Sequence, residues 1–151
     1  MKITVAESAG FCFGVNRAVE MVLKLLDEGK TVDTLGPIIH NPQMVKELEE
    51  KGVKIVFDPG ETRPNATLVV RSHGVSRQVK EKIKDLGIAC ADATCPFVSK
   101  IHQIVSDAVQ RGDTVLIAGD ASHPEVQGIT GYCENSFYVF RNSEEIGRAH
   151  V

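Results

Sequence analysis

The sequence predicts an α/β protein in which small parallel sheets are flanked by helices. Short runs rich in β-branched residues alternate with helical patterns along the whole chain. An alternating order of this kind places the strands parallel, with the helices as crossovers. The runs are almost continuously apolar, which is typical of strands covered on both faces. Trp is absent and aromatic residues are 5% of the chain, so the core must be largely aliphatic.

The predicted strands each correspond to one short apolar run. They cover residues 2–6, 31–35, 53–57, 67–71, 88–91, 114–118 and 137–140. The segment 58–66 is rich in Pro, Gly and polar residues, and it is predicted to form a surface loop.

Helices are predicted between these strands, with proline near the start or glycine just past the end. Their first marked residues are Val15, Asn41, Val79, Pro96, Pro124 and Ser143, and the glycines that end the first four are Gly29, Gly52, Gly87 and Gly112. Asn41 and Ser143 are predicted N-caps, because their side chains can accept a hydrogen bond from the first helical turn.

The composition excludes several classes of protein. The formal net charge is −3 and no basic stripe is present, so the phosphate contacts of a nucleic-acid-binding protein have no source. No apolar run approaches the ~20 residues of a membrane span. The apolar stretch at the start of the sequence is too short for a signal peptide. We therefore expect a cytoplasmic protein, whose four cysteines are free thiols or metal ligands.

Chemically reactive residues follow several of the predicted strands, each just before a helix. They are Cys12, His40, His73, Cys95 and His123. Ligands of open parallel sheets bind beyond the carboxyl ends of the strands. The sequence therefore predicts one convergent site.

The cysteines divide into two pairs. Cys12 and Cys95 precede helix N-termini, where the thiolate form is favoured and metals can be bound. Pro96 follows Cys95, as proline follows a cysteine in ferredoxin-type segments. Cys90, within a strand, and Cys133 lack this context and are predicted to be buried structural residues.

The histidines also divide. His40, His73 and His123 share the strand-end position, where imidazole and helix N-termini can donate hydrogen bonds to phosphate oxygens. His102, predicted on the outer part of a helix, and His150 are expected to be structural.

Glu125, two residues after His123, has two readings. Its carboxylate can pair with a helix dipole, worth ~0.3–1 kcal/mol, or it can donate a proton into the site. Spacing alone leaves both open.

Five motifs occur in order between Met1 and about Glu145. They are Gly10-Phe-Cys-Phe-Gly-Val-Asn-Arg-Ala, Ile39-His-Asn, Ser72-His-Gly-Val-Ser, Asp92-Ala-Thr-Cys-Pro-Phe-Val-Ser-Lys-Ile-His and His123-Pro-Glu-Val. Together they resemble the 4-hydroxy-3-methylbut-2-enyl diphosphate reductase family (the LytB type).

The resemblance implies similar α/β units around a central 4Fe-4S cluster. It implies an oxidoreductase that removes the allylic hydroxyl of hydroxymethylbutenyl diphosphate, giving isopentenyl and dimethylallyl diphosphates in the last step of the non-mevalonate pathway. A ferredoxin- or flavodoxin-type protein would be the electron donor. Cys12 and Cys95 match two of the three cluster-ligand positions.

The resemblance also implies roles for the other site residues. His40 and His73 match positions that hold the diphosphate, and His123 matches a substrate-binding position near the hydroxyl end. Glu125 matches the acid that delivers a proton.

Two of the family's three α/β units are expected here. Residues 1–95 would form the first, with the N-terminal strand and the cysteine loops, and residues 96–151 an incomplete second. The third unit, which carries the third cluster cysteine, would be missing, so the chain alone is expected to be inactive.

A metal-binding α/β module without reductase activity is the alternative, with zinc held by Cys12, Cys95 and a histidine. Closely spaced cysteine pairs, usual in such sites, are absent. A Rossmann-type nucleotide binder is disfavoured, because no Gly-x-Gly-x-x-Gly follows a strand.

Overall fold

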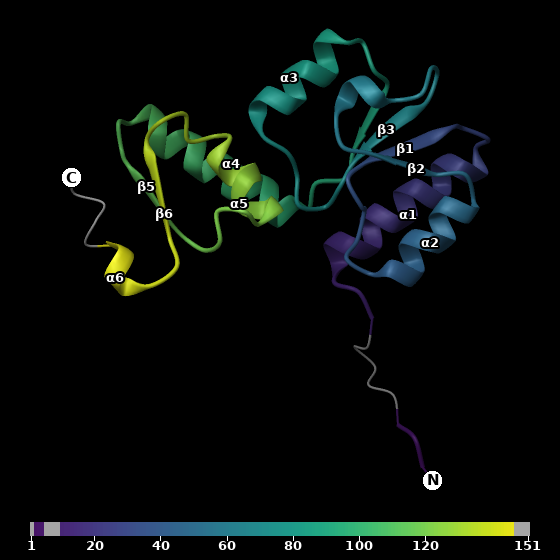
Figure 1. The fold of residues 1–151 in the computed structure, drawn as a ribbon, viewed down its shortest axis with the longest axis horizontal. Helices are drawn as coiled ribbons and strands as arrows, with labels where there is room; N and C mark the ends of the chain where they lie inside the picture. The colour runs from purple at the N-terminus through teal and green to yellow at the C-terminus, as the bar shows by residue number, and fades with distance from the viewer. Residues whose placement is uncertain (1, 5–9, 147–151) are drawn as a thin grey trace.

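A computed structural model describes residues 2–4 and 10–146 of the chain (Figure 1). In chain order the elements are α1 (Phe13–Asp27), β1 (Val32–Leu35), α2 (Pro42–Glu50), β2 (Lys54–Val56), the 3₁₀ helix η1 (Pro59–Glu61), β3 (Thr67–Val70), α3 (Arg77–Asp85), β4 (Cys90–Asp92), α4 (Pro96–Gln110), β5 (Val115–Ala118), α5 (Pro124–Thr130), β6 (Phe137–Phe140) and α6 (Ser143–Ile146). None of the helices in these ranges is long and apolar enough to cross a membrane.

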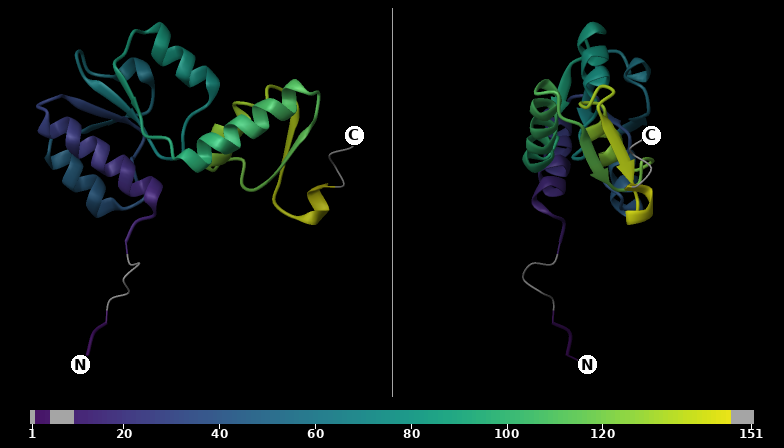
Figure 2. Two further views of the ribbon diagram at one scale, coloured as in Figure 1. Left: turned by 180° about the vertical axis from the view of Figure 1, so that it is seen from behind. Right: turned by 90° about the vertical axis from the view of Figure 1, so that its left-hand side faces the viewer.

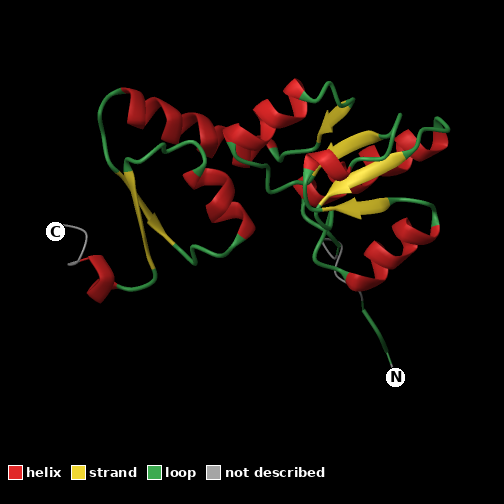
Figure 3. Cartoon of the chain, turned by 45° about the horizontal axis from the view of Figure 1, so that its top comes forward, coloured by secondary structure: helices red, strands yellow, loops and turns green. Residues whose placement is uncertain are grey.

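The first unit is a four-stranded parallel sheet in the order β2-β1-β3-β4. Residues alternate between its two faces, as the period of a strand requires. Val32 and Val69 face α1 and α2, whereas Leu68 and Val70 face α3. Helices therefore cover both faces, which Figure 3 shows from above. The predicted α/β class with small parallel sheets is confirmed.

A buried ion pair anchors one side of this sheet. Asp33, fully buried in β1, accepts hydrogen bonds from the backbone N–H and the Nε of Arg63, each 2.7 Å long. The Arg63 guanidinium also donates to the carbonyls of Val32 and Gly52, at 2.8 and 3.0 Å. The loop 58–66 is thereby held against the sheet. It contains η1, so it is less irregular than predicted.

The second unit is smaller, with β5 and β6 forming a two-stranded parallel sheet. Val105 of α4 and Val126 of α5 pack with Ile117 on one face. Leu116, which points to the other face, is 56% exposed. The expectation that every strand is covered on both faces is wrong here, because α4 and α5 pack on the same face. Figure 2 shows α4 running from the first sheet into this second lobe.

The helix boundaries largely follow the proline and glycine signals. Asn41 caps α2 as predicted, because its side chain accepts from Met44 N at 3.1 Å. At α6 the prediction is wrong: Asn142, not Ser143, accepts from the N–H groups of Glu144 and Glu145. Asn142 reaches the first turn from just outside the helix, so it takes the cap.

Two predicted strands differ from the structure. The predicted strand 88–91 lies later, at β4, where Cys90 pairs with Leu68 of β3. Of the predicted strand 2–6, residues 2–4 are in no strand, and residues 5 and 6 lie outside the described residues. The division of the chain after residue 95 stays a prediction.

Candidate active site

Three histidine rings meet beyond the carboxyl ends of the strands. His40 lies between β1 and α2, His73 between β3 and α3, and His123 just before α5. The ring centroids of His40 and His73 are 5.2 Å apart, and those of His73 and His123 are 6.2 Å apart, both edge to face. The central ring thus touches one from its own unit and one from the second unit.

The central ring favours the neutral state. Burial lowers the pKa of His73 below its ordinary value, and the nearby charges of Arg71 and His40 act in the same direction, while Glu125 opposes them. Its Nδ1 is buried and has no hydrogen-bond partner among the described residues. A neutral imidazole with one unused nitrogen is therefore held between the other two rings.

His123 is fixed by its own helix. It is the N-cap of α5, and its Nδ1 accepts a hydrogen bond from Glu125 N at 3.2 Å. Since Nδ1 accepts, the proton of the neutral ring must be on Nε2. The exposed Nε2–H of His123 is then a donor for a ligand.

Glu125 lies in the first turn of α5 and is half-buried. Its carboxylate raises the pKa of His73, so its charge acts on the same cluster of rings. The structure thus places Glu125 where its charge acts on His73 and its N–H donates to His123. Both readings of this residue are compatible with that position.

The loops of Cys12 and Cys95 lie against one another. Cys12 is the N-cap of α1 and Cys95 the N-cap of α4, and neither thiol caps its helix through the side chain. Gly14, two residues after Cys12, packs so closely on Cys95 that an added Cβ would lie 2.8 Å from its Sγ. The first turn of α1 therefore borders the Cys95 thiol.

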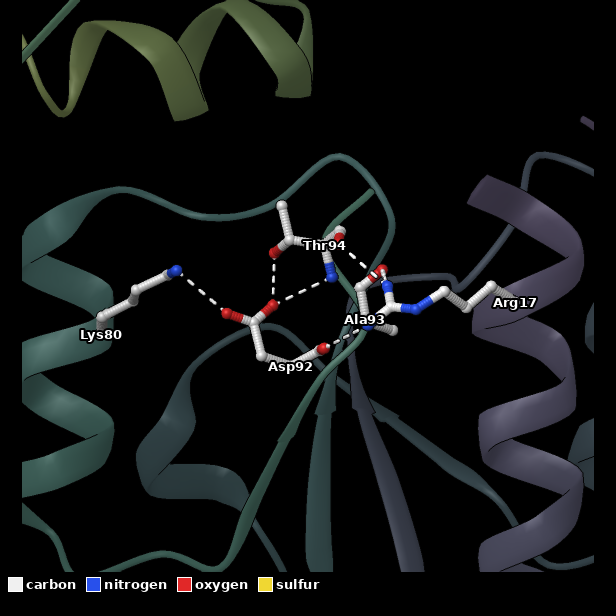
Figure 4. Close-up of polar contacts among 5 residues, drawn as sticks. All are labelled: Arg17, Lys80, Asp92, Ala93 and Thr94. Atoms are coloured by element: carbon white, nitrogen blue, oxygen red, sulfur yellow. Dashed lines mark hydrogen bonds and ion pairs between the residues drawn. The ribbon is translucent and has the colours of Figure 1, made fainter. Parts of the chain in front are cut away.

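Arg17 links α1 to the loop that leads into Cys95 (Figure 4). From α1 its guanidinium donates to the carbonyls of Ala93 at 3.2 Å and Thr94 at 2.9 Å. Asp92 fixes the same loop from the other side, since it pairs with Lys80 at 2.9 Å and accepts from Thr94 N at 2.9 Å. The segment that leads into Cys95 is thereby fixed from both helices beside it.

The remaining cysteines do not join this site. Cys133 is fully buried in the core of the second unit, as predicted. The expectation that Cys90 is buried is wrong: it is exposed, because β4 is the edge strand of its sheet.

The prediction for His102 is wrong in its placement. The residue is 4% exposed rather than on the outer part of α4, and its ring stacks on Tyr132 with 4.4 Å between centroids. Its Nε2 is buried and has no partner among the described residues. Burial lowers the pKa of His102. His150 lies outside the described residues.

Two site features escaped the sequence reasoning. Arg17 belongs to the Gly-Val-Asn-Arg-Ala motif, yet only the fold shows that it reaches the Cys95 loop. Arg71 follows β3, two residues before His73, and its charge acts on that ring. A strand that ends in arginine just before a candidate ligand was the available signal.

Metal binding can be tested against the side chains themselves. Within residues 2–4 and 10–146, no group of three or more His, Cys, Asp or Glu side chains is arranged to hold a metal ion. The zinc site formed by Cys12, Cys95 and a histidine is therefore not assembled there. The thiols of Cys12 and Cys95 make no capping hydrogen bond and lie on adjoining loops. They suit a larger iron–sulfur group that takes ligands from several segments.

Comparisons with known proteins place the chain in one family. Residues 3–150 match the family described as "LytB protein". The chain is 44% identical over 149 residues to the 4-hydroxy-3-methylbut-2-enyl diphosphate reductase of Caldanaerobacter subterraneus. The aligned part covers 96% of this chain and 52% of that relative. It thus spans about half the length of the curated relatives it matches.

Solved structures agree. A structure described as (E)-4-hydroxy-3-methyl-but-2-enyl diphosphate reductase, the terminal enzyme of the non-mevalonate pathway, is similar with a TM-score of 0.83 at 41% identity, covering 97% of this chain and 53% of that one. The E-1-hydroxy-2-methyl-but-2-enyl-4-diphosphate reductase from Plasmodium falciparum gives 0.89 at 28% identity, covering 94% and 45%. With the match over residues 3–150, these likenesses show that the chain belongs to the LytB family.

Proposed function

We propose that this chain forms part of the active site of an iron–sulfur reductase of the non-mevalonate isoprenoid pathway. The reaction would remove the hydroxyl of 4-hydroxy-3-methylbut-2-enyl diphosphate and yield isopentenyl and dimethylallyl diphosphates. The observation that carries the proposal is the meeting of His40, His73 and His123 from three separate loops, at centroid distances of 5.2 and 6.2 Å. The names of the relatives support the same reaction.

The histidines would bind and orient the substrate. Imidazole N–H groups of His40 and His73 can donate to diphosphate oxygens. The fixed Nε2–H of His123 would contact the hydroxyl end. Substrate would therefore lie across both units, with its two ends held by different lobes.

Glu125 would move the proton. The reaction releases the hydroxyl as water and adds hydrogen to the allyl group, so it consumes two electrons and two protons. A carboxyl group beside the rings can hold a proton on Oε and donate it to the departing oxygen. Its position on the first turn of α5, next to His123, supports this role.

Cys12 and Cys95 would be two of the ligands of a 4Fe-4S cluster. When bound, such a cluster supplies the electrons and an open iron position at which the hydroxyl is polarised. Arg17 and Asp92 would hold the ligand loops in register. A ferredoxin- or flavodoxin-type donor remains our expectation for the source of electrons.

Anaerobic reconstitution with iron and sulfide, with dithiothreitol as a source of further thiolate, tests the cluster. We expect a brown chain with visible charge-transfer absorption. Cys12→Ser or Cys95→Ser should lose most of it, while Cys90→Ser, the matched control at an exposed thiol, should keep it. A colourless chain with stoichiometric zinc, or colour that survives both site substitutions, would contradict the proposal.

Turnover tests the reaction. With dithionite and a viologen, we expect no reduction by the 151-residue chain, because two thiolates hold a cluster poorly. In a protein of the relatives' length that carries these residues, Glu125→Gln should retain substrate binding and lose turnover. Unchanged activity would remove Glu125 from the proton delivery.

A further inference from the structure

Arg71 lies beside the histidine cluster, and among the described residues it has no counter-ion. It is half-buried, and its Nε is shielded from solvent with no hydrogen-bond partner in the described ranges. Within those ranges it also pairs with no carboxylate. The part of this charged group that is removed from water lacks a partner, which destabilises the fold. An anionic ligand would supply the missing acceptor.

The other described arginines differ, because each has an acceptor. The acceptors are the carbonyls of Ala93 and Thr94 for Arg17, Asp33 for Arg63, Ser106 for Arg77, Asp113 for Arg111 and Asp120 for Arg141. Arg71 therefore stands apart from the arginines that have a structural role.

The backbone around Arg71 leaves room for the guanidinium. Gly36, which follows β1 with φ +73°, lies so close that an added Cβ would be 2.7 Å from Nη1 and 3.3 Å from Cζ of Arg71. Glycine adopts this conformation at the least cost, and its lack of a side chain lets the guanidinium lie this close to the backbone. The guanidinium thus lies against the start of the loop that leads to His40, while its own loop leads to His73 two residues on.

Arg71 supplies a permanent positive charge next to a histidine that does not. His73 is kept neutral by its burial and by Arg71 itself, which lowers the pKa of that ring. Neutral imidazoles donate hydrogen bonds but carry no charge, whereas a diphosphate carries several negative charges. A guanidinium offers a permanent charge and a planar fork that fits phosphate oxygens.

We propose that the Arg71 guanidinium binds the diphosphate of the substrate together with His40 and His73, as the permanent cation of that subsite. The inference rests on the proposed function, since it names one more group that holds the same substrate. The geometry that carries it is a guanidinium that packs on Gly36 at the start of the His40 loop and has no acceptor within residues 2–4 and 10–146.

Titration of the 151-residue chain with inorganic pyrophosphate tests this directly, by calorimetry at pH 8 and low salt. At that pH a histidine of ordinary pKa is neutral, so a permanent cation should dominate binding. Arg71→Gln should weaken binding about tenfold or more, and Arg71→Lys should recover part of the loss. Arg111→Gln, which removes an exposed arginine paired with Asp113, is the control and should bind as the unsubstituted chain does.

Thermal unfolding of the same variants separates binding from structure. Because Arg71 has no acceptor in the part of the chain that the structure describes, Arg71→Gln should leave the unfolding midpoint unchanged or raise it. The inference would be overturned if Arg71→Gln bound pyrophosphate as tightly as the unsubstituted chain, or if the unsubstituted chain showed no measurable binding. A large drop in the unfolding midpoint of Arg71→Gln would overturn it as well. Binding that is strong but independent of Arg71 would leave the reductase proposal standing. Binding that depends on Arg71, in a chain that takes up no iron–sulfur cluster, would support the role of Arg71 and contradict the reductase proposal.

Discussion

The two units of this chain differ in how completely their sheets are covered. In the first, helices pack on both faces, and residues such as Val32 and Leu68 are fully buried. In the second, α4 and α5 pack on the same face, and Leu116 on the other is 56% exposed. Isolated two-stranded sheets are marginally stable. The first unit is therefore expected to be stable by itself, whereas the second depends on its contacts with the first.

The candidate site is divided between these unequal supports. His40, His73 and Cys95 follow strands of the four-stranded sheet, while His123 and Glu125 lie on α5 of the second unit. The join between the units includes the close approach of Gly131 to Ser76 and a side-chain hydrogen bond from Arg77 to Ser106. Small changes there should alter the site more than equal changes elsewhere, and the predictions below test that difference.

Loss of the buried ion pair should be the largest effect. Arg63→Ala leaves the fully buried Asp33 carboxylate without its partner, which costs ~3–5 kcal/mol. Urea unfolding followed by circular dichroism would measure it. The control is Arg111→Ala in the second unit, where an exposed pair with Asp113 is worth ~0–1 kcal/mol. Similar small losses in both variants would refute the idea that the first unit is stabilised from within.

Filling the join between the units should have an intermediate effect. Gly131 ends α5 with an ordinary helical φ of −64°, so alanine is allowed by the backbone. An added Cβ, however, would overlap the Cβ of Ser76 and lie 2.7 Å from its Cα. We expect Gly131→Ala to cost ~1–3 kcal/mol.

Hydrogen exchange would show where that cost falls. Amides of α4 and α5 should exchange faster in Gly131→Ala, while those of β1 and β3 should not change. Thr130→Ala, which removes only a hydroxyl bonded within its own helix, serves as the control. Uniform loss of protection in both units would show that they unfold as one body.

Acidification should have the smallest effect, centred on the join. Burial lowers the pKa values of His102 and His73 below the ordinary 6.5. Between the folded and unfolded pKa values the unfolded chain binds more protons, so stability rises with pH. The contribution of these two histidines to the free energy of unfolding should be complete above about pH 6.5. Below that pH it should decline, by at most ~1.4 kcal/mol per pH unit for each histidine.

His102→Gln tests the assignment of that slope. Urea unfolding between pH 5 and pH 8 should give a flatter dependence in this variant than in the unsubstituted chain. An unchanged slope would mean that the lost protons belong to groups elsewhere.

The sequence predicted those parts of the fold that depend on local chemistry. Pro42 and Pro96 open helices where expected, and Asn41 caps α2. These features follow from backbone geometry within a few residues. The meeting of His40 and His73 depends instead on the pairing of β1 with β3, which the sequence did not specify.

Features that depend on tertiary contacts were not predictable. Nothing near Cys90 shows that β4 is an edge strand, or near His102 that α5 and Tyr132 cover its ring. Arg17 and Arg71 look like ordinary surface charges until the fold places one on the Cys95 loop and the other on Gly36. The roles of the site residues remain predictions to be tested.

The most direct test of the shared site is whether Cys12 and Cys95 can be bridged. In a Cys90→Ser background, with Cys133 buried, dibromobimane should join the two thiols within one molecule, because Gly14 packs on the Cys95 Sγ. Mass spectrometry should then find the two peptides linked in high yield. Both thiols modified singly, with no bridged product, would contradict the account.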